Sequence, residues 1–172
     1  MNYKTLALLA VMAGLAASAR TSAQSGTVYA DTVNRYKILV IGDWRAVSYS
    51  DAVGRPMTDF VYRDRSEGLM KIVRENLGTR SLSDFAQDEE ESMRIAHAGF
   101  ERGETEEFAA GDLHGLRMSY FYMQGSKPIA VTNYFLKDGN QLWALRFTGK
   151  RGILDQIRNV TDEMARSFRL DQ

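Results

Sequence analysis

One 35-residue stretch, GLRMSYFYMQGSKPIAVTNYFLKDGNQLWALRFTG (115–149), constrains the fold more than any other part of the chain. It holds seven of the 18 aromatic residues, and two short turns, QGSK and KDGN, divide it. Gly-Ser and Asp-Gly supply the positive φ that tight hairpin turns require. The stretch therefore predicts an antiparallel meander with strands at 116–123, 129–136 and 141–148.

Both faces of this meander are apolar. In its last strand, Trp143, Leu145 and Phe147 share one face, while Leu142 and Ala144 share the other. A sheet that is apolar on both sides needs cover on both sides, so we expect helices or a loop on each face.

The remaining elements complete an α+β pattern. Their β-branched and aromatic content predicts further strands at 36–40, 44–50, 58–64, 68–76 and 106–110. Ser81 begins a capping-box sequence, SLSD, that predicts the start of a helix. Apolar residues at helical spacing predict a closing helix over 153–168. We expect about six to seven strands in one antiparallel sheet, with the helices packed on it.

The first residues have the pattern of a secretory signal. Lys4 precedes an uncharged apolar run over 6–17, and small residues follow it. Cleavage after Ala19 and cleavage after Ala23 both fit the pattern, and we prefer the second because Arg20 directly after the cut is unfavourable. An uncleaved membrane anchor is the alternative, although the run is shorter than the roughly 20 residues of a stable span. Residues 1–23 thus predict export, to the periplasm or outside the cell.

The rest of the sequence predicts a short tether followed by one domain. Residues 24–35 are polar and small and predict a tether, and residues 36–172 form a single domain of ordinary size. Removal of residues 1–23 leaves a formal charge of −2, which gives no field to attract nucleic acid. The chain contains no cysteine, so disulfides, thiolate metal ligands and a cysteine nucleophile are excluded.

The order of elements resembles the PsbP-like superfamily, which includes the extrinsic photosystem subunit, bacterial DcrB-like exported proteins and the Ran-binding Mog family. The resemblance covers about residues 29–170 and rests on a few anchors: Asp43-Trp44, SLSDF, GDLHGLRMSY (111–120), LWALRFTG and ARSFRL. One departure is Ile41-Gly42-Asp43, where members often carry a proline before the tryptophan. The resemblance implies an α/β/α sandwich of the Mog type, usually an exported accessory or scaffold protein without enzymatic activity. It supplies no catalytic residue.

No set of residues in the sequence converges on a catalytic or metal site. His97 falls at the edge of a helical apolar stripe and His114 in an expected turn, and no zinc-hydrolase spacing or G-x-S-x-G motif is present. The acidic run 88–91 points in several directions around a helix, which predicts a solvated face rather than a calcium site. We therefore predict no catalytic residue, no metal ligand and no cofactor.

Two speculative binding sites remain. Lys150 and Arg151 directly precede the closing helix, and together with Arg146 they are candidates for an anion site.

The second candidate is a cleft between sheet and helix lined by Tyr120, Tyr122, Tyr134 and Trp143.

The sequence favours a non-enzymatic exported domain that binds a protein partner or a component of the cell envelope. A carrier of a small apolar or anionic ligand is the alternative, and an uncharacterised hydrolase ranks third.

Overall fold

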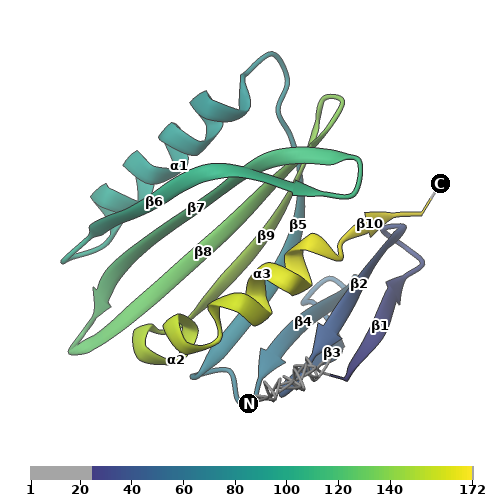
Figure 1. The fold of residues 1–172 in the computed structure, drawn as a ribbon, viewed down its shortest axis with the longest axis horizontal. Coiled ribbons are helices and arrows are strands. Elements are labelled where there is room, and N and C mark those ends of the chain that lie inside the picture. The colour runs from purple at the N-terminus through teal and green to yellow at the C-terminus, as the bar shows by residue number, and fades with distance from the viewer. Residues whose placement is uncertain (1–24, 172) are drawn as a thin grey trace, which may run out of the picture.

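A computed structural model describes residues 25–171, and within them the chain forms ten strands and three helices (Figure 1). The strands are β1 (Gly26–Asp31), β2 (Tyr36–Ile41), β3 (Trp44–Ser50), β4 (Pro56–Tyr62), β5 (Gly68–Asn76), β6 (Glu101–Ala110), β7 (Leu113–Gln124), β8 (Lys127–Asp138), β9 (Gln141–Lys150) and β10 (Arg169–Leu170). The helices are α1 (Leu82–Ala96), α2 (Arg151–Gln156) and α3 (Arg158–Arg166). The predicted signal segment, 1–23, lies outside the described residues.

The strands form two antiparallel sheets. The larger has seven strands in the order β3-β4-β5-β9-β8-β7-β6, and the smaller has three in the order β1-β2-β10. The predicted antiparallel α+β fold is confirmed, and the predicted meander is the run β7-β8-β9. Its hairpins pair Tyr122 with Ile129 and Leu136 with Trp143.

The smaller sheet was not predicted. The tether prediction for residues 24–35 is wrong over 26–31, because these residues form β1 and pair along the whole length of β2. Strand β2, expected in the main sheet, pairs instead with β1 and β10. Its side chains Tyr36, Ile38 and Ile41 are buried against the main sheet, so β2 forms part of the cover on that face.

Each face of the large sheet has its own core. The face that carries Tyr134, Trp143 and Phe147 packs against α2, α3 and β2, as Figure 1 shows for the layer formed by α3 and the small sheet. Trp44 and Trp143 are each 4% exposed, so both tryptophans are part of the core on this side.

On the opposite face, Met118, Tyr120 and Phe135 pack against Phe85 and Ala86 of α1. Helix α1 begins as predicted, because the Ser81 hydroxyl accepts the Asp84 N–H at 3.0 Å and the Asp84 carboxylate accepts from Ser81 in return. This capping box satisfies N–H groups that would otherwise have no partner.

The closing helix differs from the prediction. Residues 153–168 do not form one helix, because Ile157 has φ −103° and ψ 16° and separates α2 from α3. Strand β9 passes directly into α2 at Lys150, so no polar loop lies between them.

Cover of the sheet is incomplete on the α1 side. The main contacts of α1 with the sheet are made with β7 and β8. Figure 1 shows the helix at that end of the sheet, away from β3 and β4. The meander β7-β8-β9 is therefore covered on both faces, as expected, whereas no helix within residues 25–171 packs on the α1 side of β3 and β4.

Candidate functional site

The three cations of the predicted anion site do not converge. Arg146 lies on the α1 side of the sheet, where it pairs with Glu89 of α1 and with Glu75 at 2.9 Å. Lys150 is 3.8 Å from Glu67, and Arg151 is 3.0 Å from Glu101.

Arg151 also lies over the Phe121 ring, with Cζ 3.8 Å from the centroid. Each cation thus has its own local carboxylate partner. Helix α2 has six residues, too few for its N-terminus to add a strong dipole.

The four residues of the predicted aromatic cleft lie on opposite sides of the sheet. Tyr120 and Tyr122 face α1, whereas Tyr134 and Trp143 face α3 and the small sheet. Tyr134 is 0% exposed, and Tyr120 and Trp143 are 4% exposed. These residues form two cores and no shared cleft.

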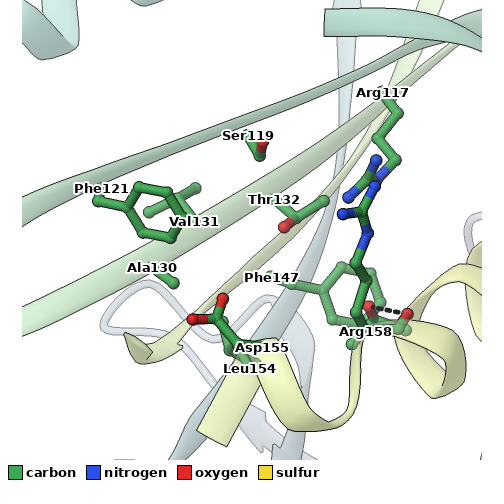
Figure 2. Close-up of a pocket in the computed structure, with 11 residues that line it drawn as sticks. Arg117, Ser119, Phe121, Ala130, Val131, Thr132, Phe147, Leu154, Asp155 and Arg158 are labelled. Atoms are coloured by element: carbon green, nitrogen blue, oxygen red, sulfur yellow. Dashed lines mark hydrogen bonds between the residues drawn. The ribbon is translucent and has the colours of Figure 1, made fainter. Parts of the chain in front are cut away.

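A small cavity does lie between the sheet and the last two helices (Figure 2). Its volume is about 60 Å³, which holds a few water molecules and no organic ligand. Arg117 of β7 and Arg158 of α3 line one end of it, and Phe121, Phe147 and Leu154 supply apolar walls.

The charged groups beside this cavity are committed to one another. Arg117, with 3% of its side chain exposed, pairs with Glu106 and lies 3.7 Å from Glu104 and 3.3 Å from Asp162. Arg158 pairs with Glu104 at 2.9 Å. The network joins α3 to β6 and β7, and its carboxylates outnumber its guanidinium groups, so it offers no site for an anion.

The histidines and the acidic runs also have structural roles. His97, at the edge of the apolar stripe of α1, stacks on Tyr122 with ring centroids 4.0 Å apart. His114 is exposed, but it lies in β7 and not in a turn. Over residues 25–171, no group of three or more His, Cys, Asp or Glu side chains is placed to hold a metal ion.

The half of the sheet beyond α1 forms a different kind of surface, which we call the open face. It consists of the β3, β4 and β5 side chains on the α1 side of the sheet: Arg45, Val47, Tyr49, Met57, Asp59, Val61, Leu69, Lys71 and Val73. Tyr49, Met57 and Val73 are 38%, 42% and 38% exposed, so three large apolar side chains of neighbouring strands are accessible on this surface.

A polar cluster is built into the open face. Asp59 is 2% exposed and accepts hydrogen bonds from Arg65 and from the Tyr49 hydroxyl at 3.2 Å. The Arg65 guanidinium also lies 5.8 Å from the centre of the Tyr49 ring. Partial burial and the charge of Asp59 raise the pKa of Tyr49, so its hydroxyl remains a donor. The cluster fixes the exposed aromatic ring in place.

The charge of the open face is positive. Arg45 and Lys71 are exposed and form no ion pair within the described part of the chain. Arg65, although paired with Asp59, is 53% exposed. The ion pairs of Arg146 with Glu75 and Glu89 form the boundary with α1.

None of the helices between residues 25 and 171 has the length and hydrophobicity that a membrane span requires.

Within residues 25–171 these features define a class: a two-sheet α+β domain with helices on both faces and one sheet surface that no helix covers. No protein-family model matches the sequence, and a comparison with curated proteins finds no match.

Solved structures share the fold. PsbP from Synechocystis sp. PCC 6803 is similar with a TM-score of 0.63 at 14% identity, over 91% of this chain and 98% of that chain. LpqN of Mycobacterium tuberculosis, involved in cell envelope biogenesis, gives a TM-score of 0.62 at 12% identity, over 89% and 88%. The Ran-binding protein Mog1p of Saccharomyces cerevisiae gives 0.60 at 9% identity, over 86% and 96%. The predicted PsbP-like, Mog-type fold is thereby confirmed.

Proposed function

We propose that this chain is an exported, non-enzymatic domain that binds a protein partner, or a protein component of the cell envelope, through the open face. The observation that carries the proposal is the exposure of Tyr49, Met57 and Val73 on a part of the sheet that no helix of the described residues, 25–171, covers. An exposed apolar surface with a polar rim is typical of protein interaction sites.

The shape and chemistry of the surface support a macromolecular partner. Tyr and Arg are enriched in protein interfaces, and the open face carries Tyr49 held between Arg65 and Asp59. An aromatic ring that is already fixed loses little conformational entropy when a partner binds it.

The descriptions of the similar structures also support a binding role. LpqN is described as involved in cell envelope biogenesis and Mog1p as a Ran-binding protein. Both descriptions concern assembly or binding, and we carry only that general role to this chain.

A small-ligand carrier is less well supported. The aromatic residues proposed to line its cleft are buried in two separate cores, and the cavity of Figure 2 has a volume of about 60 Å³. A ligand pocket for a drug-sized molecule needs roughly 300 Å³ or more. Two surface hollows of about 560 and 540 Å³ exceed that volume, but none of the four aromatic residues lines either of them.

Site-specific photo-crosslinking in the native host tests the proposal. A photoreactive phenylalanine analogue replaces Tyr49, Met57 or Val73 in turn, and matched variants carry it at Val28 or Ile95, which are 62% and 74% exposed but lie elsewhere. We expect one discrete crosslinked protein from the three open-face positions and none from the two controls.

Crosslinks that are identical at all five positions, or absent from the open face, would contradict the proposal. Fractionation of the same cells tests export, because a product that retains residues 1–23 in the cytoplasm would rule it out.

A further inference from the structure

The two edges of the large sheet differ in how they are protected. β6, at one edge, carries Glu101, Glu104, Glu106 and Glu107 and has a register shift between Arg102 and Thr105. Charges and bulges of this kind are devices that prevent a further strand from adding.

β3, at the other edge, has no bulge and only one charged residue. It pairs in continuous register with β4 from Trp44 to Ser50, without a bulge or proline, and Arg45 is its one charged residue. Ala46, Ser48, Tyr49 and Ser50 are exposed, so the described residues leave this edge accessible to solvent.

The outward backbone groups of β3 are available. Within residues 25–171, no backbone N–H or C=O of residues 45–50 forms a hydrogen bond outside the ladder with β4. In an antiparallel edge strand, about half of these groups point away from the sheet and can pair with an added strand.

The side chains beside this edge favour an added strand that carries negative charge. On the open face, β3 presents Arg45, Val47 and Tyr49 in alternation, and Arg65 lies over Tyr49. Arg45 donates to the Arg63 carbonyl at 2.7 Å and Arg65 pairs with Asp59, each through one nitrogen, so the exposed remainder of each guanidinium faces a partner. A strand added to β3 places its own alternate side chains directly beside these three residues. Carboxylates therefore fit beside Arg45 and beside Tyr49 with Arg65, and an apolar side chain fits beside Val47.

From this arrangement we infer that the free edge of β3 accepts an extended acidic segment of another protein as an additional strand. The inference rests on the proposed function and specifies how the partner is recognised. Backbone pairing supplies the affinity and the alternation of carboxylate, apolar and carboxylate side chains supplies the specificity, as in other cases of strand addition.

A second copy of this chain fits the edge less well. Pairing of two β3 strands about Val47 brings Arg45 and Arg65 of both copies together, and facing like charges are unfavourable. The acidic edge β6 of a second copy is interrupted by its bulge, and Glu104 and Glu106 are already held by Arg117 and Arg158.

The test uses the folded protein and a synthetic peptide, acetyl-Thr-Glu-Thr-Val-Thr-Glu-Thr-amide, followed by NMR. We expect the peptide to shift the amide signals of residues 45–50 and to slow hydrogen exchange of the outward amides. A peptide of the same sequence with N-methylated backbone amides keeps its charge but cannot pair, and we expect it to leave these amides unchanged.

A charge exchange gives the second measurement. Arg45→Glu should weaken binding of the acidic peptide by roughly tenfold and allow binding of a matched peptide with Lys at the one Glu position that lies beside residue 45, while the Glu beside Tyr49 and Arg65 is kept. Lys127→Glu, at an exposed hairpin position remote from β3, should change neither.

Three results would overturn the inference: no response of residues 45–50 to the peptide, equal binding of the N-methylated peptide, or a concentration-dependent dimer that protects the same amides. If crosslinking at Tyr49 still captures a partner, the failure concerns strand addition alone, whereas loss of that crosslink defeats the proposed function itself.

Discussion

Arg117 Nε lies 3.3 Å from Asp162 Oδ1, so a buried guanidinium on β7 is paired with a carboxylate on α3. The Tyr134 hydroxyl on β8 donates to the same carboxylate. Three elements that are separate in the sequence are thus fixed to one charged pair. Because α3 has no side-chain cap at its N-terminus, this network is a main polar attachment of the helix.

Substitution of Arg117 by Ala should lower the free energy of unfolding by about 3 kcal/mol, because it removes a buried side chain and leaves the partly buried Asp162, 26% exposed, without its cation. Arg158, which is 48% exposed and pairs with the exposed Glu104, is the matched control. Its replacement by Ala should cost about 1 kcal/mol or less. Urea denaturation measures both values, and equal costs for the two variants would show that burial of Arg117 has no special effect.

The stability of the fold should fall in alkaline solution. Burial, together with the charge of Glu89, raises the pKa of Tyr120 to about 12. In the unfolded chain this phenol ionises near pH 10, so the unfolded state alone loses the proton as the pH rises from about 10 to 12. The folded state gains nothing in this window, and its stability declines.

For Tyr120 we expect a free energy of unfolding about 1 kcal/mol lower at pH 11 than at pH 9. Tyr120→Phe should reduce the difference between the two pH values by that amount, and any loss that does not depend on pH cancels. Urea denaturation at both pH values provides the measurement. An unchanged difference in the variant would mean that Tyr120 ionises normally in the folded protein.

Local patterns determined much of this fold. β-branched and aromatic content located β3 and β5 with their observed bounds, and SLSD located the start of α1. Alternation also assigned Leu142 and Trp143 to opposite faces correctly, because the period of a strand fixes the face of each residue.

Other features depend on contacts between distant segments. The alternation of YKILV predicts a strand with one buried face, but it does not specify that β2 leaves the main sheet to pair with β1 and β10. The apolar residues keep helical spacing across Ile157, although the backbone at Ile157 is not helical and separates α2 from α3. The open face arises because α1 packs on β7 and β8, and only the tertiary structure reveals that β3, β4 and β5 lie beyond it. The one indication of the open face in the sequence was the alternation of Arg45, Val47 and Tyr49, which places them on one face of a strand.

Arg151 should contribute modestly to stability and not to anion binding. Its guanidinium packs on the Phe121 ring and pairs with Glu101, and a partly exposed contact of this kind contributes about 1 kcal/mol. Arg151→Ala should therefore lower the free energy of unfolding by about that amount. Lys150→Ala should change it by about 0.5 kcal/mol or less.

Thermal melts with and without millimolar phosphate complete this test. An anion bound only by the folded state at a hundredfold excess over Kd would stabilise the protein by about 2.7 kcal/mol. We expect no phosphate-dependent rise in Tm, and a rise that disappears in Arg151→Ala would establish the anion site that the geometry argues against.

Gly115 should be one of the positions least tolerant of substitution. A Cβ built on it would lie 1.7 Å from the Phe135 carbonyl oxygen on β8, and that atom belongs to the backbone and cannot rotate away. Gly115→Ala should force β7 and β8 apart and lower the free energy of unfolding by about 3 kcal/mol or more.

Gly152 provides the matched control, because it lies in α2 with open space around a Cβ. Gly152→Ala should instead stabilise the protein by about 0.5–1 kcal/mol, since alanine is the better helix former. Urea denaturation of the two variants should therefore give changes of opposite sign, and a Gly115→Ala protein as stable as the wild type would show that the two strands can separate without loss.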